Sequence, residues 1–474
     1  MPDTNRWKAL AIVCAAFFMT VLDVSIVNVA LPSIGRALHF SEANLQWVIT
    51  AYAITFGGFL LLGGRAADLL GRRRVFYVGV MLFTVASFLC GLAWSEGVLI
   101  GARALQGLGA AIISPAALSI IMTSFDEGAE RNKALGIWGA IGGSGAAVGV
   151  LAGGLLTKYL GWEWIFFVNV PVGALALLLA PRFVRESRSD REQTQDIAGA
   201  ITITAGLALL VYGVSEAPNH GWTSVWTISR LVVAAVLLIA FLVVESRAKH
   251  PLMPFRIFKV STVAGANVAG LLLGAVVFAN FFLLTLYVQN VLHWSPLKTG
   301  LTFIATAGSA VLWAGLAQAL VTKIGAKKVM ALGFLGTIAG LLWYTQIPVH
   351  ASYASNLLPG YLLIGFALPF SFIPVSIAAL AGVEQHEAGL ASGLINTAQQ
   401  VGGAIGVAVT SSVLLTHSNT LLKHGTQFPA AFTSGTRWAF WVTVGIAVAG
   451  LVATLVLIQD KQMAMAEEPV AAPG

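Results

Sequence analysis

The chain has 474 residues, of which 57% are hydrophobic and only 10% are charged, and its formal net charge is +7. Soluble domains contain about 25% charged residues, so this composition excludes a large water-soluble protein and indicates an integral membrane protein. The two cysteines, Cys14 and Cys90, lie in apolar runs and form neither a metal-binding spacing nor a disulfide framework.

Apolar runs long enough to cross a bilayer recur along the whole chain. A transmembrane helix needs about 20 mostly apolar residues, and the predicted spans are 8–31, 45–64, 75–94, 98–121, 134–157, 163–181, 197–215, 228–245, 262–291, 299–320, 327–347, 355–378, 388–415 and 436–458. The first span continues past Asp23 to Leu31 without a small-residue cleavage site, so we interpret it as a retained span and not as a signal peptide. No phosphate-binding Gly-x-x-x-x-Gly-Lys-Ser/Thr loop occurs, which argues against ATP-driven transport by this chain.

Basic residues are distributed unevenly between the segments that join the spans. With the N-terminus placed inside, 20 of the 27 Lys and Arg lie in inner segments, six lie in outer segments, and Arg103 lies within a span. This strong positive-inside bias predicts a multi-pass protein of the cytoplasmic (inner or plasma) membrane with both termini in the cytoplasm. The positive charge is then topological, so no nucleic-acid partner is expected, whereas membrane lipid is.

Two loops resemble each other and indicate an internal duplication. The loop GGRAADLLGRRRVF follows the second span, and the loop QALVTKIGAKKVM follows the tenth. Aligning Gly71 with Gly325 places the pair Arg73 and Arg74 over the pair Lys327 and Lys328. Both loops then join the second and third spans of a six-span block, and parallel halves are a recurrent plan among transporters.

This pattern predicts an all-α membrane protein of fourteen transmembrane helices, with two six-helix bundles plus two extra helices between them. The N-terminal six-helix bundle is assigned to 1–190, the two inserted helices and linkers to 191–260, and the C-terminal six-helix bundle and cytoplasmic tail to 261–474. The inserted spans carry almost no polar residues, so they are expected to face lipid entirely. The segment 416–435 is expected to be the longest outer loop and to form a small lid.

One acid and one base are predicted at membrane depth. Asp23 interrupts the run FFMTVLDVSIVNVALP, and burial disfavours its charged form, so it can take up and release a proton as its exposure alternates or pair with a cationic substrate. Arg103 cannot lose its proton and needs an anion or carbonyl groups, with Asp23 as the natural partner, directly or through Gln106 and water. The alternatives are an Asp that is only structural, satisfied by Ser25 or Asn28, and an arginine that only packs helices.

Two further groups of residues have candidate roles in conformational change. Asp68, with Arg72, Arg73 and Arg74, is expected to form a cytoplasmic gate in which the acid caps a helix end and pairs with a basic residue; the arginines could also act as an orientation signal alone. The glycines of the fifth span have small-xxx-small spacing on one helix face, which allows helices to slide or seal but equally suits ordinary close packing. These glycines are Gly145, Gly149, Gly153 and Gly154.

Aromatic and amide side chains within the spans are candidates for a substrate cavity. Such walls suit lipophilic cations through apolar contact and cation–π attraction, although any one aromatic is more often a packing residue. The candidates are Trp47, Tyr52, Gln106, Asn280, Tyr287, Gln289, Trp313, Asn396, Gln399 and Gln400.

Five segments, in this order, resemble the fourteen-span drug–proton antiporter branch of the major facilitator superfamily. They are LDVSIVNVALP, GGRAADLLGRRRVF, ARALQGLGAA, GSGAAVGVLAGG and ASGLINTAQQVGGAIGVA, and the likeness covers nearly the whole chain. The chain departs from the branch at Val150, where proline usually follows the glycine, and at Gln399, where a basic residue is usual.

The resemblance implies a proton-coupled secondary antiporter that exports lipophilic or cationic drugs by alternating access, with Asp23 as the protonation site and Arg103 tied to proton coupling. It implies multidrug efflux, antibiotic resistance, a monomer, no cofactor besides the proton gradient, and no metal. An exporter of a dedicated antibiotic, lipid or metabolite on the same fold remains an open alternative. A membrane enzyme or receptor would need a second polar cluster at one membrane face, and the sequence offers none.

Overall fold

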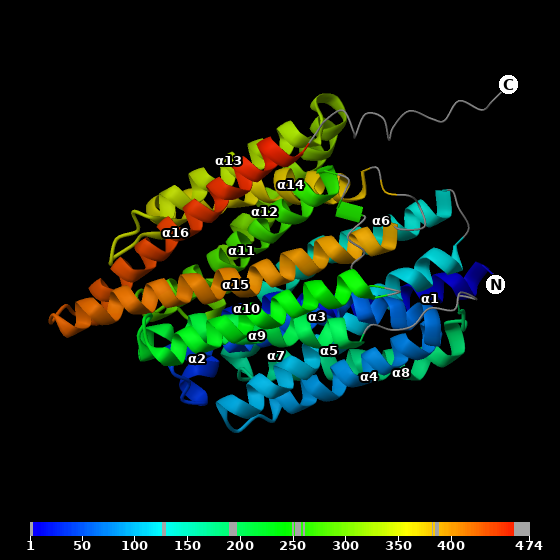
Figure 1. Cartoon of the computed structure of the whole chain (residues 1–474), viewed down its shortest axis with the longest axis horizontal. Coiled ribbons are helices and arrows are strands. Elements are labelled where there is room, and N and C mark those ends of the chain that lie inside the picture. The colour runs from blue at the N-terminus through cyan, green and yellow to red at the C-terminus, as the bar shows by residue number, and fades with distance from the viewer. Residues whose placement is uncertain are drawn as a thin grey trace.

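The computed structural model of the chain describes residues 3–125, 129–188, 197–248, 251, 257–258, 261–381, 383 and 388–458. In that part, the regular elements are all helical (Figure 1). Up to residue 188 they are α1 (Asp3–Ala37), α2 (Glu42–Leu45), α3 (Trp47–Leu70), α4 (Arg72–Gly91), α5 (Glu96–Ser124), α6 (Ala129–Tyr159), α7 (Trp164–Phe167) and α8 (Asn169–Phe183).

The second part of the chain repeats this plan of long apolar helices joined by short turns. Its elements are α11 (Ser261–Asn290), α12 (Pro296–Ile324), α13 (Ala326–Tyr344), a single π-helical turn η2 (Tyr353–Leu357), α14 (Leu358–Leu380), α15 (Ala388–Lys423) and α16 (Phe428–Leu457). Because α15 extends to Lys423 and α16 begins at Phe428, the lid expected over 416–435 is instead two helix ends joined by a short turn.

The two aligned glycines have the same backbone conformation. Gly71 ends α3 and precedes α4 with φ of 105°, and Gly325 ends α12 and precedes α13 with φ of 87°. Residues with a Cβ rarely adopt positive φ, so a glycine is required where one helix stops and the next starts after a single residue. The repeated loop in the sequence therefore corresponds to a repeated turn in the structure.

The inserted helices, α9 (Ile197–His220) and α10 (Val225–Arg247), differ in their surroundings. Along α10, large apolar side chains are exposed, as expected for a lipid-facing helix. By contrast, α9 packs between the two halves: Leu207 shares a buried cluster with Ile54 of α3 and Ala404 of α15. The expectation that both inserted helices face lipid entirely is therefore wrong for α9, whose small and β-branched residues fit against neighbouring helices.

Eleven helices in the described part are long and apolar enough to cross a membrane, judged by length and composition. Shorter apolar segments also occur within three further helices: Trp47–Leu60 in α3, Val148–Tyr159 in α6 and Ile201–Val214 in α9. Each predicted span falls on one of the helices or on a consecutive pair, such as α7 with α8. The chain is thus an all-helical membrane protein, and the number of crossings stays a prediction.

The apolar core differs between the two ends of the molecule. We call the end at which α1 begins and α16 ends the terminal end, and the other the far end (Figure 1). At the far end one buried cluster includes residues of both halves, such as Ile26 of α1 and Phe282 of α11. At the terminal end the core is divided into a cluster around Phe76 in the first half and one around Phe334 in the second. Among the described residues, the buried apolar core is therefore shared between the halves at the far end and divided between them at the terminal end.

Candidate functional site

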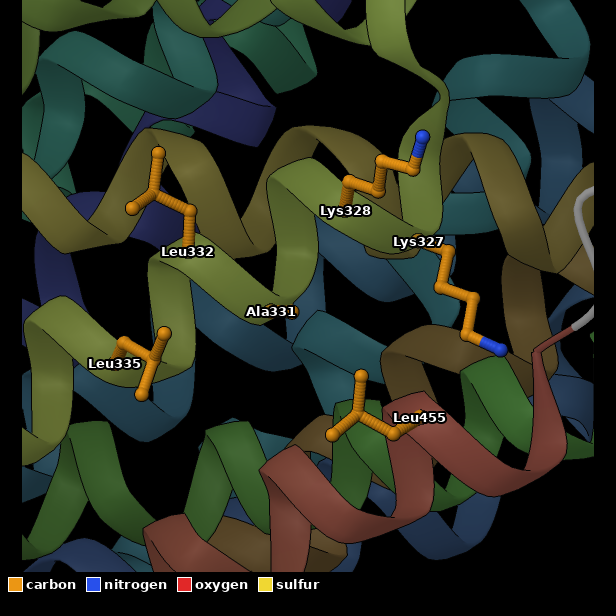
Figure 2. A pocket seen from close by; sticks show the side chains of 6 residues that line it. All are labelled: Lys327, Lys328, Ala331, Leu332, Leu335 and Leu455. Atoms are coloured by element: carbon orange, nitrogen blue, oxygen red, sulfur yellow. The ribbon is translucent and has the colours of Figure 1, made fainter.

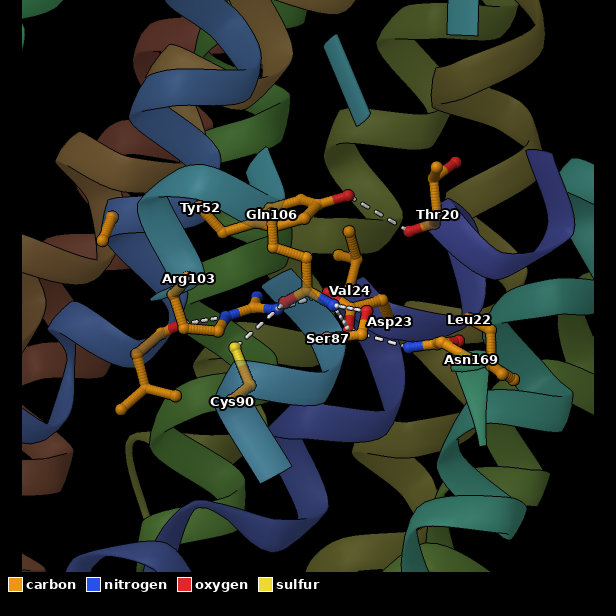
Figure 3. A network of polar contacts seen from close by, with 12 residues as sticks. Thr20, Leu22, Asp23, Val24, Tyr52, Ser87, Cys90, Arg103, Gln106 and Asn169 are labelled. Atoms are coloured by element: carbon orange, nitrogen blue, oxygen red, sulfur yellow. Dashed lines mark hydrogen bonds and ion pairs between the residues drawn. The ribbon is translucent and has the colours of Figure 1, made fainter. Parts of the chain in front are cut away.

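Asp23 lies in the middle of the first-half bundle, surrounded by polar side chains from four other helices (Figure 3). Arg103 on α5 forms an ion pair with its carboxylate, and Gln106, one turn further along α5, donates a hydrogen bond to Oδ1 at 2.8 Å. From α8, Asn169 Nδ2 donates to the same oxygen at 3.4 Å. The predicted pairing of Asp23 with Arg103 and Gln106 is present.

Arg103 is held by more than its ion pair. Its Nε donates to the carbonyl oxygen of Val48 on α3 at 2.8 Å, and a terminal nitrogen donates to Gln106 Oε1 at 2.6 Å. The guanidinium carbon lies 4.4 Å from the centre of the Tyr52 ring, within the range of a cation–π contact. Arginine suits this position because its planar group can satisfy an acid, an amide and a carbonyl together.

This network is closed to solvent. The side chain of Asp23 is 0% exposed and that of Arg103 is 1% exposed. Isolated charges at this depth would be very costly, whereas an ion pair with additional hydrogen bonds offsets much of the desolvation. In the same arrangement, the protonation of Asp23 and the ion pairing of Arg103 depend on each other, because a proton on Asp23 would leave the guanidinium without its anion. The site can therefore couple proton binding to a rearrangement of α1 against α5.

The residues considered as partners in a purely structural role for Asp23 bond elsewhere. Ser25 donates to the carbonyl oxygen of Leu22 at 2.9 Å, and Asn28 donates to that of Val24 at 2.8 Å. The partners that sequence reasoning missed are Asn169, and Ser87 on α4, whose oxygen accepts from Gln106 Nε2 at 2.8 Å. The only sequence signal for them was a polar residue inside an apolar run, which many spans share.

The glycines of α6 pack against the part of α1 that carries Asp23. A Cβ on Gly145 would lie 2.8 Å from Val21 Cγ1, and one on Gly149 would lie 2.9 Å from the Leu22 carbonyl oxygen. One turn later, a Cβ on Gly153 would lie 2.7 Å from the carbonyl oxygen of Ile26. Real Cβ atoms essentially never approach so closely, so these glycines allow two backbones to meet on either side of Asp23.

Gly154 faces the other half of the molecule. A Cβ there would lie 2.9 Å from the Cα atom of Leu297 at the start of α12, and a Cβ on Gly300 would lie 2.7 Å from the Val150 carbonyl oxygen. Nearby, Gln289 Nε2 of α11 donates to the carbonyl oxygen of Val29 on α1 at 2.8 Å. The glycine segment thus links the Asp23 network to the seam between the halves at the far end.

The basic loop between α3 and α4 contacts an acid that the sequence analysis did not single out. Asp68 was expected to cap a helix end and to pair with a basic residue, but its side chain lies outside the described residues. Glu186, just after α8, accepts from the backbone N–H groups of Arg73 and Arg74 at 3.1 and 3.2 Å. Glu186 Oε2 also lies 3.7 Å from Arg73 Nε and 3.8 Å from Arg74 Nε. In addition, the backbone N–H of Arg72 donates to the carbonyl oxygen of Ser187. The loop is therefore tied to the end of its own half.

Substituting Glu186 with Gln is expected to lower the free energy of unfolding by about 1 kcal/mol, because a negative charge at the start of a helix complements its dipole. Arg74→Gln, which affects a side chain that is 77% exposed, is expected to change it by less than about 0.5 kcal/mol, since exposed ion pairs contribute little. Thermal unfolding of the two purified variants measures both effects. Equal destabilisation by the two substitutions would contradict the capping role of Glu186.

The ten candidate cavity residues do not share one set of neighbours. Tyr52 and Gln106 belong to the Asp23 network, and Gln289 to the far-end seam. Four others are packed within or beside the bundles: the Trp47 ring lies 6.1 Å from that of Tyr212, Trp313 lies 5.3 Å from Phe366, Tyr287 donates to the Pro348 carbonyl oxygen, and the backbone of Gln399 packs on Gly274.

The remaining three are amides. Asn396 is exposed and bonds to the Ser392 carbonyl oxygen of its own helix. Asn280 Oδ1 on α11 and Gln400 Oε1 on α15 are buried and have no hydrogen-bond partner among the described residues. Gln289 Oε1 is likewise buried and without a partner among the described residues. Buried acceptors are normally paired, so these three oxygens are the candidates best placed to accept hydrogen bonds from a bound molecule.

Comparison with known proteins agrees with this architecture. The sequence profile of the Major Facilitator Superfamily matches residues 13–407. The puromycin resistance protein pur8 of Streptomyces alboniger is 42% identical over 460 residues, which cover 96% of this chain and 91% of that protein. The cephamycin export protein CmcT of Amycolatopsis lactamdurans is 40% identical over 410 residues, covering 85% and 84%.

Among solved structures, the fold resembles a bacterial homolog of the human lysosomal transporter Spinster in an inward-facing and unoccupied conformation. The TM-score is 0.70 at 16% sequence identity, and the match covers 99% of this chain and 100% of that chain. With a family profile that spans most of its length and relatives of 40% identity or more that align over most of theirs, the chain belongs to the major facilitator superfamily.

Proposed function

We propose that this transporter is a proton-coupled antiporter that exports lipophilic, often cationic compounds across the bacterial plasma membrane by alternating access. It crosses the membrane fourteen times with both termini in the cytoplasm, as the positive-inside bias predicts. The terminal end, where the apolar core is divided between the halves, is then the cytoplasmic end, and the far end faces outside.

The observation that supports proton coupling best is the buried ion pair between Asp23 and Arg103. A titratable acid at membrane depth, bonded to an arginine and two amides, marks a proton relay in membrane proteins. Protonation of Asp23 releases Arg103, and the glycine contacts at Gly149 and Gly153 transmit a shift of α1 to α6. Because α6 meets α12 at Gly154, such a shift reaches the seam between the halves.

A dedicated antibiotic exporter on the same fold is supported to a similar degree. Two relatives that match over most of their length are described as a puromycin resistance protein and a cephamycin export protein, and each of these descriptions names one compound or class. A third, from Mycobacterium tuberculosis, is described as a multidrug resistance protein. The unpaired acceptors of Asn280 and Gln400 suit a substrate with N–H or O–H donors, which both kinds of substrate can provide. The two functions differ in breadth of substrate and not in mechanism.

The two functions are separated by expressing the chain in a bacterial host that lacks its own efflux pumps. Growth inhibition is measured with puromycin, a cephamycin and the lipophilic cation ethidium. Resistance to ethidium together with other unrelated compounds supports multidrug export, and resistance to one antibiotic alone supports dedicated export. In proteoliposomes with an internal pH dye, each exported compound is expected to drive proton movement. Substrate transport without any proton movement would refute the coupling.

A further inference from the structure

A groove opens on the outer surface between α13 and α16, near the terminal end (Figure 2). It has a volume of about 430 Å³ and is lined by Lys327, Lys328, Ala331, Leu332, Leu335 and Leu455. Its apolar walls are open to the surroundings, since Leu335 is 52% exposed and Leu455 is 49% exposed. The groove thus combines a basic rim, at the first turn of α13, with an apolar floor.

The first half has a second groove at the corresponding place. It is lined by Arg73, Arg74, Tyr77, Val78 and Pro181, with a volume of about 440 Å³. The alignment of Gly71 with Gly325 places the arginine pair on the lysine pair, and it also places Tyr77 on Ala331 and Val78 on Leu332. The internal duplication has therefore preserved a basic pair above an apolar groove in both halves.

The two grooves differ in the anion that they contain. In the first half, the carboxylate of Glu186 accepts from the backbone N–H groups of Arg73 and Arg74 and lies near both guanidinium groups. In the second half, no carboxylate of the described residues forms an ion pair with Lys327 or Lys328. Cations at the start of a helix oppose its dipole, so the lysine pair has both the charge and the position to bind an anion from outside the chain.

We propose that the groove between α13 and α16 binds an anionic phospholipid of the cytoplasmic leaflet. Its phosphate lies at the first turn of α13, where Lys327 and Lys328 supply the positive charge, and an acyl chain runs along Leu332, Leu335 and Leu455. The assignment to the cytoplasmic leaflet rests on the orientation given under the proposed function. A free phosphate would use the lysines only, whereas a lipid also covers the exposed leucines.

The test measures lipid binding to the purified full chain by native mass spectrometry, with phosphatidylglycerol and phosphatidylcholine as probes. Replacing both lysines, Lys327→Gln with Lys328→Gln, is expected to weaken phosphatidylglycerol binding by about 25-fold, because each lysine near an anionic headgroup contributes roughly fivefold. Binding of phosphatidylcholine should not change. The control variant, Lys158→Gln with Lys423→Gln, has the same net charge and should bind phosphatidylglycerol as the original chain does.

Three results would overturn the proposal. One is equal phosphatidylglycerol binding by the lysine variant and the original chain. Another is equal protection against thermal unfolding by inorganic phosphate and by phosphatidylglycerol, which would indicate an anion site without a lipid. The last concerns Asp460, an acid that follows α16 in the sequence. Tight binding only after Asp460→Asn would indicate that an acid of the chain itself occupies the site. Lipid binding is measured here without transport. The lipid proposal and the proposed proton exchange can therefore each fail without the other.

Discussion

Asp23→Asn is expected to abolish substrate-driven proton movement and the resistance that depends on it. The amide keeps the size of the side chain but cannot exchange a proton at any physiological pH. The substitution also leaves Arg103 as a buried cation without its anion, which is expected to destabilise the protein by about 3–5 kcal/mol. Proton flux in proteoliposomes and thermal unfolding of the same preparation measure the two consequences separately.

The double variant Asp23→Asn with Arg103→Gln separates lost coupling from poor folding. It removes both charges, so most of the lost stability should return, while proton movement should stay absent. The side chains that contact the pair are polar and can bond to amides, since Gln106 and Asn169 each carry both a donor and an acceptor. Substrate-driven proton exchange at the original rate in either variant would show that Asp23 is not the coupling site.

Gly153→Ala is expected to lower the free energy of unfolding by about 1–3 kcal/mol, because a methyl group cannot fit in a packed interface without backbone movement. Its Cβ would lie 2.7 Å from the Ile26 carbonyl oxygen. Since Ile26 is one turn beyond Asp23, the displacement of α1 should also slow export. Thermal unfolding and the rate of substrate efflux from cells are the two measurements.

The matched control is Gly315→Ala on α12. Apart from its two chain neighbours and the adjacent backbone of its own helix, no heavy atom of the described residues lies within 4 Å of the position of its Cβ. Alanine should therefore raise stability by up to about 1 kcal/mol through its greater helix propensity. The same chemical change is therefore expected to have opposite signs at the two positions. If Gly153→Ala proved as harmless as Gly315→Ala, close contact between α1 and α6 would not be required for stability.

The helices and the central pair could be predicted from the sequence for simple physical reasons. Hydrocarbon requires long apolar runs, and these determine where the helices lie. Asp23 and Arg103 were the only acid and base expected at depth, so each was the natural partner of the other, and the structure places them together. The glycine spacing of α6 predicted a face for close packing, and Gly149 and Gly153 do meet the backbone of α1.

The remaining contacts depend on packing that a linear pattern does not contain. Asn169 and Ser87 join the network because α8 packs against α1 and α4 packs against α5. Nothing in their local sequence distinguishes them from other polar residues in spans. Glu186 lies in a loop without periodicity, so its position under α4 could not be predicted. The apolar composition of α9 suited lipid and protein equally, and only the fold shows that it packs between α3 and α15.

The unequal apolar core has a consequence for the energetics of transport. Because the far-end cluster includes residues of both halves, opening that end must expose the cluster, while closing the terminal end can join the two separate clusters there. The free-energy difference between the two orientations then depends on two apolar areas. One is buried at the far end in one orientation and the other at the terminal end in the other orientation, and each contributes in proportion to its size. A polar substitution at Phe282 would favour exposure of the far end. A polar substitution in one of the two terminal-end clusters would oppose it. In the proposed mechanism, the resting orientation of the transporter can therefore be adjusted without changing Asp23 or Arg103.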